Sequence, residues 1–247
     1  RLRREILRLE VFFDTNERTN RIELTVEIAG LNTDECRDGL MWVKTILSTP
    51  NLHRNNLPRI KDVVDLNLGS QRDRMRGSEE SWVMDPAQAF RNQVNPLFLT
   101  ASSFLTQKHA LLRLRWQLKQ ADKNTLEIFT KWMGNTAQQA ETGREDLISW
   151  IEESPPIPED IDFLANEALQ DLEIGLSDIP DESLDQDWRY LCHIITEDLA
   201  VSPDQVLDNI SFLLKSITHQ DNLRSYIISS SNTYLELKEE IFSLVAD

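Results

Sequence analysis

The chain has 247 residues, 40% of them hydrophobic, which is enough for one large core or two small ones without disulfide or metal support. Its formal charge of -16 lies in one stretch: residues 141 to 198 hold 18 of the 42 acidic and two of the 26 basic residues, so the remaining 24 of each sign cancel. Such a stretch repels nucleic-acid phosphates and anionic lipid headgroups, so we expect neither nucleic acid nor a membrane as a partner.

The sequence contains no membrane-spanning run and no secretory signal. No apolar run reaches the roughly 18 to 20 residues that cross a bilayer, and no signal-peptide pattern occurs. Cys36 and Cys192 lie far apart on predicted helices, which favours buried thiols in a reducing compartment, with a single disulfide as the alternative. The basic amphipathic start, RLRREILRL, indicates a piece of a longer polypeptide.

Two strands are predicted near the start of the sequence. Residues 21–29, RIELTVEIA, alternate between apolar and polar side chains, which is the period of a half-buried strand. Residues 6–14, ILRLEVFFD, form the second candidate, and the polar TNERTN between them favours a hairpin turn. Asn32, with Glu35 three residues later, predicts the capped start of a helix that ends by Pro50.

Helical periodicity dominates the middle of the sequence. Pro58 stands at the first position of one predicted helix, and Asp85 with Pro86 marks the start of another. The stretch 97–118 is a further helix that ends in LLRLRWQLK, where Arg113 and Arg115 stand among apolar residues. The same period predicts helices at 123–133, 145–153, 159–174, 186–199 and 203–218.

The last predicted elements are a strand and a helix. Residues 223–231, LRSYIISSS, are rich in β-branched and aromatic residues, and TYLELKEEIFSLVA is an amphipathic helix. Strands near both ends predict an α+β fold: a mainly antiparallel sheet with a helical layer and a long helical insertion. We expect one α+β domain or fragment over residues 1–247, with an acidic helical sub-region at about 141–200 and a break at SPPIP, residues 154–158.

The sequence offers no complete catalytic or metal-binding set. Its four histidines are scattered and neither H-E-x-x-H nor H-x-x-E-H occurs, so the paired imidazoles of a zinc hydrolase are missing. Cys192, His193 and Glu197 share one predicted helix, which a buried cysteine beside a surface histidine explains more simply. No serine elbow or phosphate loop occurs either. We therefore assign no catalytic, cofactor-binding or metal residue.

Two residue sets have both a structural and a functional interpretation. Arg72, Arg74 and Arg76 are either the solvated face of a helix or a site for a carboxylate of a neighbouring segment. The tryptophans fall at amphipathic positions and are predicted as core anchors rather than stacking platforms for a ligand: Trp42, Trp82, Trp116, Trp132, Trp150 and Trp188.

Several stretches resemble the insulinase-like zinc metallopeptidases, in the branch of the presequence protease and falcilysin. They are LTVEIAGLNTDE with the following CRDGLMWVKTILSTPNL, then RIKDVVDLNLGSQRDRMRGSEESWV, and finally DNLRSYIISSSNTYLELKEEIFSLVA. The resemblance is one of pattern and order over most of residues 10–120 and 185–247. It implies a non-catalytic later domain of a four-domain enzyme whose two halves close around unfolded peptides.

The resemblance has consequences for the site. The family's zinc ligands lie in an H-x-x-E-H motif and a downstream glutamate of the first domain, so it implies no cofactor in this fragment and zinc elsewhere in the parent enzyme. The family's substrate-binding arginine and tyrosine have no counterpart, since Arg224 and Tyr226 fall in a predicted strand. The implied partners are other domains of the same polypeptide and unfolded peptides. The implied compartment is intracellular, with the mitochondrion and the plastid as candidates.

Two hypotheses for the function follow. The first is a non-catalytic domain of a presequence-protease-like peptidase, which forms chamber wall and contacts between the enzyme's halves. The alternative is a stand-alone helical interaction module whose acidic face binds a basic protein. They differ in one structural expectation, because only the first needs the strands near the two ends to share a sheet.

Overall fold

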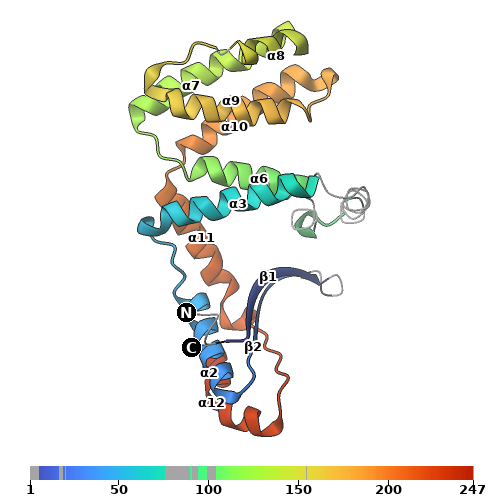
Figure 1. Ribbon diagram of the computed structural model, residues 1–247, viewed down its shortest axis with the longest axis vertical. Coiled ribbons are helices and arrows are strands. Elements are labelled where there is room, and N and C mark those ends of the chain that lie inside the picture. Colours follow the sequence, from blue (N-terminus) through green and yellow to red (C-terminus); the bar gives the residue numbers. More distant parts are fainter. Residues whose placement is uncertain are drawn as a thin grey trace. The chain divides into compact units, whose positions relative to one another are not determined.

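The computed structural model (Figure 1) describes residues 6–16, 19, 21–75, 90, 94–98, 104–153 and 155–246. The chain divides into two compact units. Unit 1 consists of residues 1–56, 74–107 and 207–247, and unit 2 of residues 57–73 and 108–206. No helix among the described residues is long and apolar enough to cross a membrane.

Unit 1 contains a β-hairpin. Strand β1 (Arg8–Asn16) pairs antiparallel with β2 (Arg21–Ala29), from Arg8 opposite Ala29 to Asn16 opposite Arg21, without a bulge. The two strands predicted near the start are therefore confirmed. Because side chains alternate across a strand, this register gathers apolar residues on one face of the hairpin: Leu9, Val11, Phe13, Ile22, Leu24, Val26 and Ile28.

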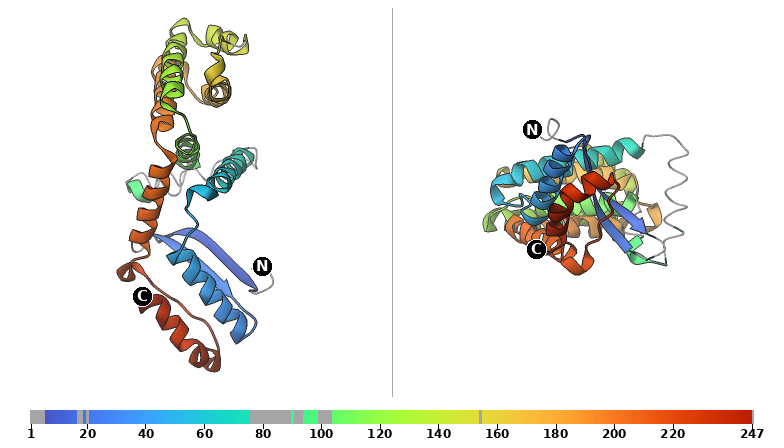
Figure 2. Two further views of the ribbon diagram at one scale, coloured as in Figure 1. Left: turned by 90° about the vertical axis from the view of Figure 1, so that its left-hand side faces the viewer. Right: turned by 90° about the horizontal axis from the view of Figure 1, so that it is seen from below.

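Helix α2 (Thr33–Ser48) packs against β2 (Figure 2). Its start resembles a capping box, as the sequence predicts: Asn32 Oδ1 accepts a hydrogen bond from the Glu35 amide at 2.9 Å, and the Glu35 carboxylate accepts at 2.9 Å from the amide of Leu31, the residue before the cap. A Cβ on Gly39 would lie 3.0 Å from Cδ1 of Ile28, so the missing side chain lets α2 approach the apolar face closely.

Helix α12 (Ser231–Ala246) packs on α2 in turn. Leu237 and Ile241 of this helix are buried, and Glu240 Oε1 accepts a hydrogen bond from Arg37 Nε at 2.9 Å. Most of α11 (Pro203–Ile217) also belongs to unit 1, with the short 3-10 helices η1 (Arg54–Asn56) and η5 (Gln220–Asn222).

The strand predicted at 223–231 is wrong. Residues 223–230 have no regular secondary structure, and the Ser230 hydroxyl accepts a hydrogen bond from the Thr233 amide at the start of α12. β-branched residues favour a strand only where a neighbouring strand edge accepts them. Here Tyr226 and Ile228 are exposed and residues 223–230 pair with no strand in the described part of the chain.

The expected α+β fold class is also wrong, because it depended on that strand. The described residues form a mainly helical structure whose sheet is the two-stranded hairpin, not an α+β fold built on a mainly antiparallel sheet. The prediction failed because it assumed that distant segments with strand propensity pair with each other, and propensity does not determine pairing.

Unit 2 is helical. Its helices are α3 (Leu57–Met75), α6 (Phe104–Gln117), α7 (Lys123–Gln138), α8 (Arg144–Glu152), α9 (Asp162–Leu176) and α10 (Leu184–Ala200), with the short 3-10 helices η2 (Gln139–Thr142), η3 (Glu159–Ile161) and η4 (Asp181–Ser183). Helix α10 packs on α7 and α9, and α8 packs on α9. The helices predicted between residues 123 and 218 are confirmed to within a few residues, whereas the start predicted at Asp85 lies outside the described residues.

Three tryptophans anchor the unit 2 core, as predicted. Trp116 and Trp188 are almost fully buried, and the Trp188 indole donates to the Thr136 carbonyl at 2.9 Å. The Trp132 indole donates to the carbonyl of Pro156 at 3.3 Å, which ties the SPPIP segment to α7. Trp82 lies outside the described residues.

Candidate functional site

Two sets of acidic residues in unit 2 differ in their surroundings. One set accepts charged hydrogen bonds from bases of the same unit, and the other consists of exposed carboxylates that form no ion pair among the described residues. The first set stabilises the fold.

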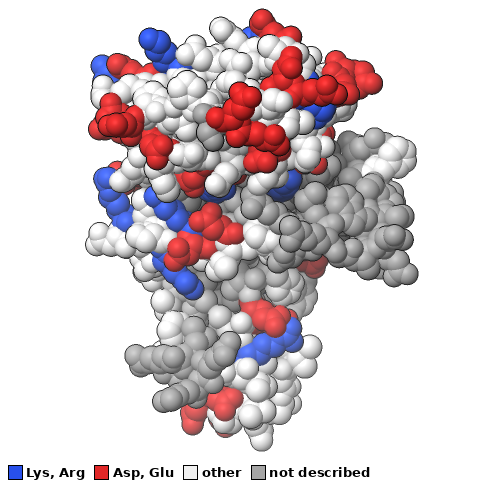
Figure 3. Space-filling view, turned by 45° about the horizontal axis from the view of Figure 1, so that its top comes forward, with Lys and Arg blue, Asp and Glu red and all other residues white. Residues whose placement is uncertain are grey.

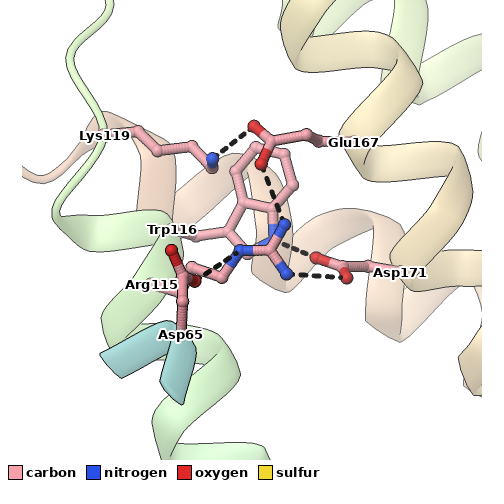
Figure 4. Close-up of polar contacts among 6 residues, drawn as sticks. All are labelled: Asp65, Arg115, Trp116, Lys119, Glu167 and Asp171. Atoms are coloured by element: carbon pink, nitrogen blue, oxygen red, sulfur yellow. Dashed lines mark hydrogen bonds and ion pairs between the residues drawn. The ribbon is translucent and has the colours of Figure 1, made fainter. Parts of the chain in front are cut away.

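Arg115 of α6 is the centre of the larger buried network (Figure 4). Its guanidinium donates to Glu167 Oε1 at 2.9 Å and to Asp171 Oδ1 at 3.1 Å, and its Nε lies 3.6 Å from Asp65 Oδ1. The second oxygen of Asp171 accepts from the Trp116 indole at 3.0 Å. Carboxylates from α3 and α9 are thus joined to one side chain of α6.

Lys119 extends this network by one turn. Its ammonium group donates to the second oxygen of Glu167 and lies over two aromatic rings, 5.0 Å from the centroid of Trp116 and 5.6 Å from that of Phe163. A cation held against aromatic faces and a carboxylate is stabilised by both.

The network holds Glu167 ionised. Burial alone would raise the pKa of this carboxyl group, but the hydrogen bonds from Lys119 and Arg115 outweigh burial and lower the pKa below its ordinary value of 4.5. Likewise, burial opposes the charge of Arg115, but Asp171 and Glu167 raise its pKa. These groups therefore form ion pairs that join α6 to α9.

The lowered pKa of Glu167 predicts acid-sensitive stability. A carboxyl group whose pKa falls on folding stabilises the fold above its unfolded-state pKa, and this contribution is lost as the pH falls through its folded-state pKa. We expect Glu167→Gln to be less stable than the wild type at pH 7, with a difference that shrinks below about pH 4.5. Urea titrations from pH 7 to 3 measure it, and a difference independent of pH would contradict the assignment.

A second ion pair joins α6 to α10. Arg113 donates through Nε and Nη2 to the two oxygens of Asp198, both at 2.9 Å, and the Gln117 amide donates to Oδ1 at 2.7 Å. The Asp198 side chain is only 2% exposed, whereas that of Arg113 is 42% exposed. The planar guanidinium fork thus satisfies a carboxylate that has almost no access to water.

The fork geometry predicts that lysine cannot replace Arg113. Arg113→Lys keeps the charge but offers a single ammonium, so we expect a loss of about 1–2 kcal/mol of folding free energy. Arg189→Lys is the matched control, because Arg189 pairs with the exposed residues Asp185 and Glu141. Chemical denaturation measures both, and equal losses would refute a special role for the fork.

The second set consists of seven acids on α8 and at the start of α9. Glu145, Asp146, Glu152 and Glu153 recur at the spacing of one helix face, opposite the buried Leu147. Glu159, Asp160 and Asp162 follow in η3 and the first turn of α9. All seven are exposed, and none forms an ion pair among the described residues. We name these residues the α8–α9 acidic surface, and Figure 3 shows acidic side chains spread over this end of unit 2.

The two ends of α8 differ in their effect on the helix. Glu145 and Asp146 stand in its first turn, where the helix dipole favours negative charge, and the same holds for Asp162 in α9. Glu152 and Glu153 stand at the carboxyl end of α8, where the dipole opposes negative charge and the last turn holds no base. Helix stability therefore accounts for the first-turn acids but not for Glu152 and Glu153.

The other residues considered from the sequence do not form a site. Glu197 lies 3.2 Å from His193 Nε2, but the Cys192 thiol is buried, which raises its pKa to about 12 and makes it inert. The described residues contain no group of three or more potential metal ligands. Arg224 reaches Glu23 at 3.5 Å, whereas Tyr226 is exposed.

The side chains of the three arginines predicted as a solvated helix face or a carboxylate-binding site lie outside the described residues. Arg76 lies outside the described residues, and so do the side chains of Arg72 and Arg74. A pocket in unit 2, lined mainly by Leu68, Leu112, Ile174 and Leu191, holds about 60 Å³, which is too little for a typical ligand site of about 300 Å³ or more.

Counting charges along the sequence did not separate the acids that form ion pairs from the acids that stay exposed. The bases that neutralise the buried acids lie outside the acidic stretch 141–198: Arg113 and Arg115 on α6, and Lys119 two residues after its end. The LLRLRWQLK pattern was the one sequence signal for these bases, because arginines between leucines on a partly buried helix need partners.

Comparison with family models, curated proteins and solved structures finds no match to this chain.

Proposed function

We propose that this chain is a non-catalytic protein-binding module and that the α8–α9 acidic surface binds a basic segment of polypeptide. Seven exposed carboxylates within 18 residues of sequence, from Glu145 to Asp162, create a negative potential that attracts lysine and arginine side chains over roughly a Debye length of 8 Å. The bases nearest in sequence do not cancel it, because Arg144 pairs with Asp181 and Arg189 with Glu141 and Asp185.

The observation that carries the proposal is the placement of Glu152 and Glu153. Both are exposed at the end of α8 where the helix dipole disfavours them, so they cost folding stability in the free protein. A bound lysine or arginine would reverse that cost. Residues that destabilise the fold while serving a partner are common at binding sites.

The structure bears differently on the two hypotheses for the function. The peptidase hypothesis expected a sheet shared by strands from both ends, and residues 223–230 form no such strand. The interaction-module hypothesis needs no shared sheet, and we therefore prefer it. Membership of the insulinase-like family, with a role as chamber wall in peptide degradation, stays a prediction. In that setting the same surface would meet basic stretches of an unfolded peptide.

Binding to a defined peptide tests the proposal. A fluorescent peptide of alternating lysine and alanine should bind the chain, and its affinity should fall about tenfold or more between roughly 50 and 200 mM salt. A control peptide with glutamate in place of lysine should not bind. Equal binding of the two peptides, or none, would contradict the proposal.

The non-catalytic part needs its own measurement. The purified chain, incubated with zinc and an unfolded peptide, should leave the peptide intact, as judged by mass spectrometry. Cleavage that a chelator abolishes would contradict this part while leaving the binding proposal to the peptide experiment.

A further inference from the structure

The outer edge of β1 has no partner strand in the described part of the chain. The sheet of unit 1 has two strands, so one edge of β1 presents backbone amide and carbonyl groups that the hairpin does not use. Isolated two-stranded sheets are marginal in water, and a nine-residue edge is long for an unprotected strand.

The apolar face is also left open on the β1 side. Helix α2 packs on β2, where Ile28 contacts Gly39, while Val11 and Phe13 on β1 are 48% and 68% exposed. Proteins usually block such an edge with proline, lysine or a bulge, and β1 has none of them.

We propose that β1 pairs antiparallel with β1 of a second copy of this chain, about a two-fold axis at Val11, to form a four-stranded sheet. This inference does not rest on the proposed function, because it concerns unit 1 alone. In this register Arg8 of each copy stands opposite Asp14 of the other, and Leu9 stands opposite Phe13, so opposite charges and apolar side chains meet.

The neighbouring registers are less favourable. Apolar faces coincide only if the axis passes through a residue, because a half-residue shift sets the apolar face of one copy beside the polar face of the other. An axis at Glu10 places two Glu10 side chains directly opposite, and an axis at Phe12 places Glu10 opposite Asp14. Directly opposed like charges destabilise a sheet, which disfavours both of these registers. An axis at Phe13 opposes no like charges but sets Asp14 opposite Phe12 and Glu10 opposite Asn16. The axis at Val11 is preferred because it sets opposite charges opposite each other.

Substitutions that reverse the charge at Arg8 or Asp14 provide the test. Sedimentation velocity should show a concentration-dependent dimer of twice the 28.6 kDa chain mass, with a dissociation constant in the micromolar range expected of a small interface. Arg8→Asp or Asp14→Arg alone sets like charges opposite each other twice, and should raise the dissociation constant about tenfold or more.

Mixing the two variants distinguishes pairing from a folding defect. A one-to-one mixture of Arg8→Asp and Asp14→Arg restores both opposite-charge contacts, so heterodimers should form more tightly than either homodimer. The double variant R8D/D14R should likewise dimerise more tightly than either single variant. Recovery should fall short of the wild type, because an aspartate at position 8 lies beside Glu10 and Glu27, which pair with Arg8 within the hairpin. A wild type that stays monomeric up to about 500 µM, or a mixture and double variant without recovery, would overturn the proposal.

Discussion

Replacing Arg115 by methionine should destabilise unit 2 by about 3–5 kcal/mol, because it leaves Glu167 and Asp171 close together without the cation that bridges them. The Asp171 side chain is only 6% exposed, so water cannot replace the lost guanidinium. Lys119 still reaches Glu167, and the Trp116 indole still reaches Asp171, but neither bridges the two. Chemical denaturation followed by tryptophan fluorescence measures the loss.

Two further variants separate charge burial from lost packing. Arg115→Met with Asp171→Asn removes the stranded charge while the asparagine oxygen still accepts from Trp116, so part of the stability should return. Arg189→Met deletes an arginine from exposed pairs and should cost about 0–1 kcal/mol. A loss for Arg115→Met no larger than for Arg189→Met would show that the network contributes little.

Replacing both Glu152 and Glu153 by lysine should change binding and stability in opposite directions. We expect the affinity for a basic peptide to fall about 30-fold or more at low salt, since two attractive contacts become repulsive at roughly 1 kcal/mol each. Unit 2 should become more stable by about 0.3–1 kcal/mol per residue, because positive charge at the carboxyl end of α8 suits the helix dipole.

The matched control is the same change on another helix. Glu236→Lys with Glu239→Lys alters net charge equally at exposed positions of α12 in unit 1. It should weaken peptide binding only through the modest long-range effect of net charge. Anisotropy titrations compare the two double variants, and equal weakening would assign the attraction to overall charge instead of the α8–α9 acidic surface.

Local patterns were sufficient where an element is determined by its own residues. The strict alternation of residues 21–29 predicted β2, and Asn32 with Glu35 predicted the start of α2. Both signals are complete within a few residues, since a capping box satisfies its own amide groups and an alternating strand needs only one apolar face.

Pairing between distant residues could not be predicted in the same way. The strand expected at 223–231 needed a free sheet edge, and Ser230 is used instead at the start of α12. The sequence also could not show which acids of the stretch 141–198 pair with bases elsewhere in the chain and which stay exposed. Arg115 pairs with Glu167, 52 residues later, and Arg113 pairs with Asp198, 85 residues later. Counting charges within a short stretch of sequence cannot detect pairs this far apart. The candidate site was therefore predicted in sign and region, but not as the smaller surface on α8 and α9.

The central claim is that the α8–α9 acidic surface is where a basic polypeptide binds. Hydrogen exchange with and without a saturating lysine-rich peptide tests it most directly, because protection reports the bound segment. The account predicts added protection in residues 144–162 that disappears at high salt. Protection confined to other segments, or none despite measurable binding, would contradict it.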